Sequence, residues 1–227
     1  DGGYCVMRDG WADADNFMIV DAGEVGGLSG GHGHADTLSI VVSIDGRPLL
    51  IDSGTYTYHE SQELRDYFRS TSAHNTLEID GISSSEPGSA FGWRTRAGAR
   101  IERWIGTDRF DYFEGSHDGY MRLESPAVHT RSILFLKGDY WIIRDVVETD
   151  GEHAYSLNFH FDPRVATTIG DDGTSIGGDG HRIYTFGDNG NWEQKESWVS
   201  TNHGNRVNAP LMRFVSQGIG KQEFWTF

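Results

Sequence analysis

The feature that most constrains the fold is a two-residue alternation of apolar and polar side chains that recurs along the chain. In the segment 38–44, positions 38, 40, 42 and 44 are apolar, which is the period of a strand with one buried face. Asp45-Gly46 follows, and this pair favours a two-residue hairpin turn. The apolar run before Asp52 is then a second strand, and a two-residue turn would place Asp52 opposite Ser39.

The same strand-and-turn pattern continues along most of the chain. Glycine accounts for 30 of the 227 residues, roughly twice the usual share of about 7 per cent, which suits many strands joined by tight turns. One short helix is expected near 60–70. The pattern predicts an all-β fold, a large two-layer antiparallel β-sandwich that occupies residues 1–227 as one domain. Beyond the hairpin at 38–52, the expected strands are 77–79, 99–106, 109–115, 131–136, 140–147, 154–162, 182–187, 211–216 and 221–227.

The composition excludes several classes of protein. The chain has 19 basic and 34 acidic residues and a formal net charge of −15, which argues against a sequence-independent grip on nucleic acid or on an anionic membrane. No apolar run approaches the roughly 20 residues of a membrane-spanning helix. Cys5 is the single cysteine, so an internal disulfide and a cysteine-rich zinc site are both excluded.

Three separate segments carry residues that suit a metal ion. His32 and His34 lie two residues apart in a glycine-rich run, so on an extended backbone both point to one side. Asp52 ends an apolar run, where a carboxylate is costly unless it is paired or bound to a metal. His74 precedes the strand at 77–79. His34, Asp52 and His74 would make a ligand set with one open position, which suits zinc. The alternative is that Asp52 caps a turn and His74 is a hydrogen-bonded structural histidine.

Two further groups of side chains leave their roles open. Tyr56 and Tyr58 alternate, as on a strand surface, although a tyrosine beside a cation can also transfer protons. Four arginines, at 94, 96, 100 and 103, form a basic island in this acidic chain. They suit carboxylate or sulfate groups and equally suit a solvated edge strand.

Three ordered motifs resemble one known family. The runs Gly31–Ser39 (GHGHADTLS), Leu50–Tyr56 (LIDSGTY) and Tyr67–Leu77 (YFRSTSAHNTL) are similar to the opening of the C-terminal domain of the heparinase II/III polysaccharide lyases. Three ordered motifs within about 50 residues are far more specific than any one of them. The resemblance implies the β-sandwich of an enzyme whose N-terminal part is an α/α toroid, so we expect the toroid to lie outside this chain.

The resemblance also implies an activity and a set of site residues. Such lyases cleave uronic-acid polysaccharides, such as heparan sulfate or alginate, by β-elimination. His34, Asp52 and His74 would be ligands of Zn²⁺, and His32 would face the substrate as a catalytic residue. Tyr56 and Arg69 would bind substrate, and Asn75 would buttress the site together with Arg69.

The resemblance further implies two partners and a location. The partners would be an acidic polysaccharide and an α/α toroid of the same or a companion chain. The catalytic tyrosine would come from that toroid, so this chain alone would be incompletely active. A bacterial periplasmic or secreted location would follow.

Two alternatives remain at this stage. The first is a non-catalytic carbohydrate-binding or structural sandwich domain with a stabilising metal. The second is a cupin-like metalloenzyme, which also uses a His-x-His pair. Cupins need a glutamate three or four residues after the second histidine, and those positions here are Thr37 and Leu38, which disfavours this alternative.

Overall fold

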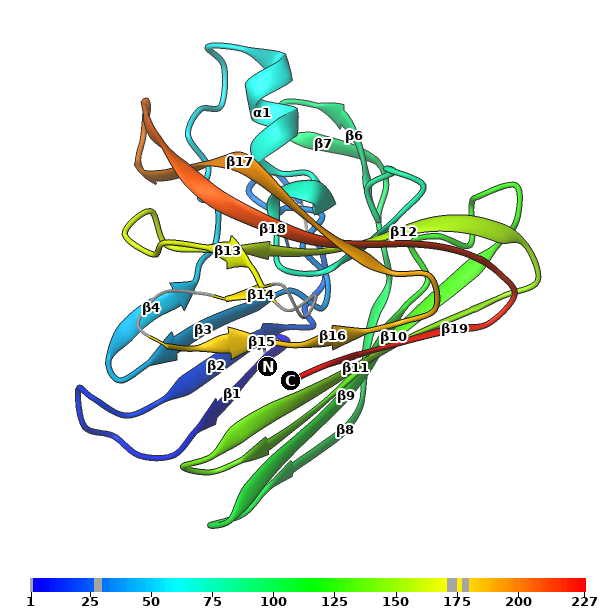
Figure 1. Ribbon diagram of the computed structural model, residues 1–227. Helices are drawn as coiled ribbons and strands as arrows, with labels where there is room; N and C mark the ends of the chain where they lie inside the picture. Colours follow the sequence, from blue (N-terminus) through cyan, green and yellow to red (C-terminus); the bar gives the residue numbers. More distant parts are fainter. Residues whose placement is uncertain (1, 27–29, 171–174, 177–179) are drawn as a thin grey trace.

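The computed structural model describes residues 2–26, 30–170, 175–176 and 180–227. Antiparallel strands dominate it (Figure 1). One sheet has the order β1 (Tyr4–Arg8), β2 (Phe17–Asp21), β3 (Ile40–Ile44) and β4 (Arg47–Leu50). A larger sheet has the order β16 (Thr185–Phe186), β19 (Gln222–Thr226), β11 (Tyr140–Thr149), β10 (Ala127–Leu136), β9 (Phe110–His117) and β8 (Ala99–Gly106).

Three further sheets complete the described strands. The first has the order β17 (Asn191–Asn202), β18 (Asn205–Ile219), β12 (Glu152–His160) and β5 (Leu77–Ile79). Two small sheets consist of β13 (Thr168–Ile169), β14 (Ser175–Ile176) and β15 (Arg182–Ile183), and of β6 (Glu86–Ser89) and β7 (Gly92–Thr95). The predicted strand at 182–187 is thus divided between β15 and β16, which belong to different sheets.

Strand alternation places the core between the sheets. Along β10, every second side chain is buried, beginning with Ala127, because successive side chains of a strand point to opposite faces. Phe113 and Phe135 of the six-stranded sheet share one hydrophobic cluster with Met18 of β2 and Phe214 of β18. The all-β sandwich predicted from the sequence is confirmed.

The β1–β4 sheet is joined to β12 beyond the end of β4. Leu50 forms an isolated bridge with Phe161, and the Ile51 amide donates to the carbonyl of His160 at 2.9 Å. Asp45 and Gly46 both have positive φ, 51° and 70°, as a type I′ hairpin turn requires. Beyond this turn the pairing of β3 with β4 shifts by one residue, so that Val42 pairs with Leu50 rather than with Leu49. The expected pairing of Asp52 with Ser39 is therefore wrong.

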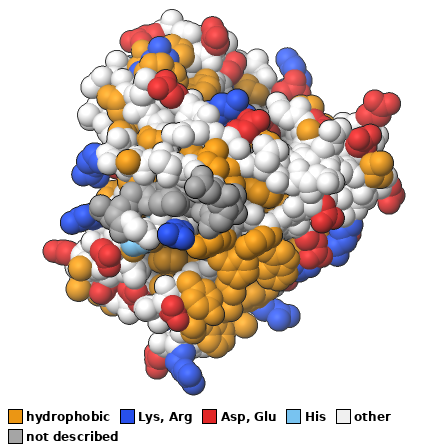
Figure 2. Space-filling view, viewed as in Figure 1, with side chains coloured by type: hydrophobic (Ala, Val, Ile, Leu, Met, Phe, Trp, Pro, Cys, Tyr) orange, Lys and Arg blue, Asp and Glu red, His pale blue; other side chains and the backbone are white. Residues whose placement is uncertain are grey.

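The predicted short helix is α1 (Gln62–Phe68), and the 3₁₀ turn η1 (Thr71–Ala73) follows it. The helix begins at Ser61, whose hydroxyl accepts from the Leu64 amide at 3.2 Å, as a good N-cap does. No helix among the described residues is long and apolar enough to cross a membrane. Figure 2 shows hydrophobic side chains gathered over β16 and β19, and the exposed aromatic residues there include Phe186 and Trp225.

Candidate metal centre

The three predicted ligand residues lie on segments that connect regular elements. His34 lies between β2 and β3, Asp52 follows β4, and His74 follows η1. Asn75 joins these elements: its side-chain amide donates to the carbonyls of Ile40 and Ile51 at 2.8 and 2.9 Å, and its side-chain oxygen accepts from the His160 amide at 2.6 Å. The buttressing role expected of Asn75 is confirmed, and it explains how residues far apart in sequence come together.

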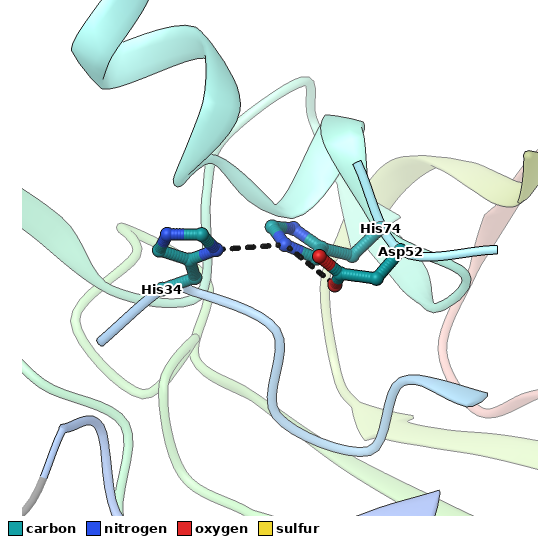
Figure 3. Close-up of side chains that lie close together, drawn as sticks. All are labelled: His34, Asp52 and His74. Carbon is teal, nitrogen blue, oxygen red and sulfur yellow. Dashed lines mark hydrogen bonds and ion pairs between the residues drawn. The ribbon is translucent and has the colours of Figure 1, made fainter. Parts of the chain in front are cut away.

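The ligand atoms of these residues lie within 4.8 Å of one another. His34 Nδ1 is 3.2 Å from His74 Nε2, which is 3.5 Å from Asp52 Oδ2 (Figure 3). Ligands about 2.0–2.1 Å from a tetrahedral zinc ion are about 3.3–3.4 Å apart. Two of the three ligand–ligand distances are therefore close to the edge of a tetrahedral coordination site, and the third is within 4.8 Å.

Hydrogen bonds outside the cluster leave lone pairs pointing into it. His74 Nδ1 lies 2.7 Å from the carbonyl of Ser70, and since a carbonyl only accepts, Nδ1 carries the proton and Nε2 a lone pair. Asp52 Oδ1 accepts from the Gly54 amide at 2.7 Å, so Oδ2 faces the imidazoles. His34 presents Nδ1 to His74 Nε2, while its buried Nε2, on the far side of the ring, has no partner among the described residues. Converging lone pairs of this kind fit a cation, so the residues fit the metal ion that the sequence predicts.

Electrostatics keep both kinds of ligand in their coordinating forms. Burial, with the neighbouring imidazole of His74, lowers the pKa of His34 to about 3, so this imidazole is neutral at neutral pH. Burial would raise the pKa of Asp52, but the imidazoles of His74 and His34 and the Gly54 amide hold that pKa below its usual value. Metal ligands need deprotonated nitrogen and oxygen atoms, and both residues provide them.

The cluster borders an open pocket of about 540 Å³. His32 is exposed beside it, and its Nδ1 lies 3.1 Å from the hydroxyl of Tyr58. His32 and His34 thus border one pocket, as their spacing predicted. The carboxylates in its wall belong to Asp21, Glu24, Asp36 and Asp52, and Tyr4 and His32 also line it. Burial, with smaller contributions from neighbouring carboxylates, raises the pKa of Asp36 to about 6. A wall of this charge favours a cation.

The two predicted substrate-binding residues lie apart from this pocket wall. Tyr56 is half-buried, stacked on Phe68 at 5.3 Å between ring centroids, with the guanidinium of Arg206 5.3 Å from its ring. Its role in substrate binding stays a prediction. Arg69 is fully buried, and its guanidinium donates to Asp66 and to the carbonyls of Ser89, Ala90 and Gly92. This placement corrects the direct substrate contact expected of Arg69, because the hydrogen bonds occupy all of its donor nitrogens.

Sequence reasoning gave little weight to the residue that contacts His32. The sequence leaves the role of Tyr58 open, and the structure brings its hydroxyl to the imidazole of His32. Its alternation with Tyr56 was the available signal. In the basic island, Arg94 pairs with Glu86, and Arg100 lies 3.9 Å from Glu102.

The fold and the site together define a class: a β-sandwich domain in which two histidines and one aspartate converge beside an open pocket. A family model described as "Heparinase II/III-like, C-terminal" matches residues 1–220. The chain therefore belongs to the heparinase II/III-like C-terminal domain family, as the three motifs indicated.

Similar proteins support this assignment. A heparin-sulfate lyase of Pedobacter heparinus is 25% identical over 162 residues, which cover 70% of this chain and 22% of the relative. A heparin-sulfate lyase of Bacteroides thetaiotaomicron is 25% identical over 175 residues, which cover 74% of this chain and 23% of the relative. The chain thus spans less than a quarter of the length of these curated relatives.

Solved structures share the fold. A mutant of the heparan sulfate lyase of Pedobacter heparinus superposes with a TM-score of 0.83 at 19% identity, covering 100% of this chain and 35% of that one. A heparinase III structure superposes with a TM-score of 0.81 at 22% identity, covering 99% of this chain and 34% of that one.

Proposed function

We propose that the chain is the β-sandwich part of a polysaccharide lyase, with a zinc ion held by His34, Asp52 and His74. The substrate would be a uronic-acid-containing polysaccharide such as heparan sulfate or alginate. The observation that carries the proposal is the convergence of three ligand atoms within 4.8 Å beside a pocket, in a chain whose relatives are heparin-sulfate lyases.

The proposed reaction is β-elimination. A base removes the proton at C5 of the uronate, the bond from C4 to O4 breaks as a C4–C5 double bond forms, and an acid protonates the departing O4. The C5 proton becomes acidic when the neighbouring carboxylate is neutralised. His32 would approach that carboxylate or that proton. Its exposed imidazole, with one nitrogen in contact with Tyr58, supports this role. Bound zinc would supply a fixed positive charge that organises the loops carrying His32 and His34.

The remaining catalytic groups would come from an α/α toroid of the same or a companion chain, and periplasmic or secreted export remains part of the proposal. The chain's coverage of about a third of the solved relatives leaves room for such a part. We therefore expect this chain alone to release little unsaturated uronate from heparan sulfate or alginate. Robust turnover by this chain alone would contradict this division of labour.

Metal analysis tests the proposed site. We expect close to one zinc ion per chain after dialysis, and strongly reduced zinc in His74→Ala and Asp52→Ala. His181→Ala is the matched control, since His181 lies outside the cluster. Stoichiometric zinc in the His74→Ala protein would contradict the assignment.

The alternative of a non-catalytic carbohydrate-binding domain predicts a different result. In an active protein that includes this chain, His32→Ala would then leave the rate of uronate release unchanged. The lyase proposal predicts a loss of about a hundredfold or more, the range in which proton-transfer residues contribute.

A further inference from the structure

An exposed aromatic residue stands at the tip of the β6–β7 hairpin, next to His32. Phe91 is 53% exposed and lies in the two-residue turn between Ser89 and Gly92. Its ring stacks on that of Tyr58, with 5.5 Å between centroids and 12° between planes. The imidazole of His32 meets both rings edge-on, at 5.3 Å from Tyr58 and 6.4 Å from Phe91.

Two buried arginines hold this hairpin tip in place. Arg65 and Arg69 of the α1 region are both 0% exposed. The carbonyl of Ala90, adjacent to Phe91, accepts from Arg65 Nε at 3.1 Å and from Arg69 Nη1 at 3.5 Å. Burying a guanidinium is costly. Two buried guanidinium groups that donate to the same turn therefore fix the position of that turn.

Arg65 also connects the hairpin tip to the loop that carries His32. Its Nη2 donates at 3.2 Å to the carbonyl of Gly31, the residue before His32. Its guanidinium lies 5.0 Å from the ring of Tyr58, within the range of a cation–π contact. One buried side chain therefore sets the positions of His32, Tyr58 and Phe91 relative to one another.

We propose that Phe91 and Tyr58 form a binding platform for one pyranose ring of the polysaccharide, beside the sugar on which His32 acts, with Arg65 as the positioning residue. This inference rests on the proposed function and adds a binding subsite to it. The exposed face of Phe91 receives the apolar C–H face of the sugar ring, and Tyr58 supports Phe91 from its other side. The exposed imidazole of His203 lies 6.1 Å from the Tyr58 ring, between centroids, and that of His59 lies 6.4 Å from His203. Both can donate hydrogen bonds to hydroxyl or carboxylate oxygens.

The size of the platform favours a sugar over a protein partner. A stable protein interface buries about 800 Å² on each side, whereas two stacked rings with an imidazole rim match a single sugar. Ligand sites combine a small apolar surface with a few placed polar groups in this way.

The test is binding of size-defined heparan sulfate and alginate oligosaccharides to the zinc-loaded chain, measured by calorimetry. We expect Phe91→Ala to weaken binding of the preferred oligosaccharide about tenfold or more, and Phe91→Tyr to restore it. Phe186→Ala is the matched control, because Phe186 is similarly exposed, at 57%, on β16. Thermal unfolding and zinc content should be the same in all three variants.

Different outcomes separate this proposal from the function on which it rests. Wild-type binding in Phe91→Ala, with normal zinc content, would overturn the platform and leave the lyase assignment standing. If the wild-type chain took up no zinc and bound neither oligosaccharide, both the platform and the lyase assignment would be overturned. If Phe91→Ala bound the oligosaccharides normally but no longer bound a companion domain, Phe91 would serve a protein interface. That result would also overturn the platform.

Discussion

Among the described residues, two clusters each contain two histidines and one aspartate, and their hydrogen bonds differ in kind. In the candidate metal centre, His34 Nδ1 and His74 Nε2 are 3.2 Å apart, and Asp52 is 46% exposed. In the sandwich core, His129 Nδ1 and His117 Nε2 are also 3.2 Å apart, but Asp145 is 1% exposed and 2.7 Å from His129 Nε2.

In the core cluster every hydrogen has a defined acceptor. The Gly119 amide donates to His117 Nδ1 at 3.2 Å, so His117 Nε2 carries a proton and donates to His129 Nδ1. His129 Nε2 then donates to Asp145. Arg131 completes this chain through two hydrogen bonds to Asp145, at 2.7 and 3.1 Å. In this chain neither imidazole keeps a lone pair free for a cation, whereas in the candidate metal centre His34 Nδ1, His74 Nε2 and Asp52 Oδ2 lie close together.

The core cluster also supports the metal centre. Arg131 Nη1 donates to the carbonyls of Leu38 and Asn75 at 2.7 and 2.9 Å, and these residues lie on the loops that carry His34 and His74. Leu38 has a φ of 63°, a conformation that is uncommon for leucine, and its carbonyl is held there by this contact. The comparison teaches that the same residue types act as ligands or as scaffold depending on where their protons lie.

The largest expected effect comes from removing the carboxylate of the core cluster. Asp145→Ala leaves the buried guanidinium of Arg131 without its counter-ion, which costs roughly 3–5 kcal/mol. Denaturant unfolding measures this loss. The control is Glu223→Ala, which removes the half-exposed partner of Arg144 on the same sheet and should cost less than about 1 kcal/mol. Equal losses in the two variants would contradict the assigned role of Asp145.

Zinc should stabilise the protein by binding at the candidate metal centre and not at the core cluster. At a thousandfold excess of free zinc over the dissociation constant, the free energy of unfolding rises by about 4 kcal/mol. We expect no such increment in His74→Ala, and an unchanged increment in His117→Gln, whose substitution lies in the core cluster. Thermal unfolding with and without a chelator provides the measurement. An increment that disappears in His117→Gln would reverse the assignment of the two clusters.

The core cluster should make the zinc-free protein sensitive to acid. Burial and neighbouring cationic groups lower the pKa of His117 well below its usual range, and burial lowers that of His129. The unfolded chain then binds more protons as the pH falls below about 6.5, so stability falls with pH. This loss of stability should grow as the pH falls further below that value.

A second loss of stability should follow at lower pH. Burial would raise the pKa of Asp145, but the guanidinium of Arg131 and the imidazole of His129 lower it to about 2. Its stabilising contribution is present above about pH 4 and is lost between about 4 and 2. Denaturant unfolding from pH 7 to about 2 measures both steps. A flat profile between pH 7 and 5 would show that the histidines are not held neutral.

A smaller effect is expected from a substitution at Gly54, whose backbone amide holds the Asp52 carboxylate. Gly54 has a φ of +73°, and an added Cβ would lie 2.1 Å from the carbonyl oxygen of Ser200. Gly54→Ala should cost roughly 1–2 kcal/mol for the backbone conformation and should also weaken zinc binding. Gly138→Ala is the matched control, with a φ of +78° and nothing within 4 Å. It should show the loss of stability without the change in zinc affinity.

Much of the sandwich could be predicted because side-chain alternation is a local property. The hairpin of β10 and β11 follows the predicted segments, with both strands extending beyond them. β17 was missed because three consecutive exposed residues, Gln194, Lys195 and Glu196, are polar and conceal the period. The pairing of Asp52 was mispredicted because a bulge in β3–β4 changes the register, and no residue type specifies that bulge.

Part of the site could be predicted because its motifs carry ligand residues at recognisable positions. His34, Asp52 and His74 converge as proposed. Arg69 was misassigned because its sequence does not reveal that Asp66 and the hairpin carbonyls occupy its donors. The core cluster was not predicted, although His129 and Arg131 occupy inward positions of β10 where apolar residues are the rule.

The most direct test of the metal-centre assignment is an anomalous difference map from crystals of the zinc-loaded protein, recorded at the zinc absorption edge. We predict a peak between His34 Nδ1, His74 Nε2 and Asp52 Oδ2. A peak among His117, His129 and Asp145, or no peak at the first cluster, would contradict the account.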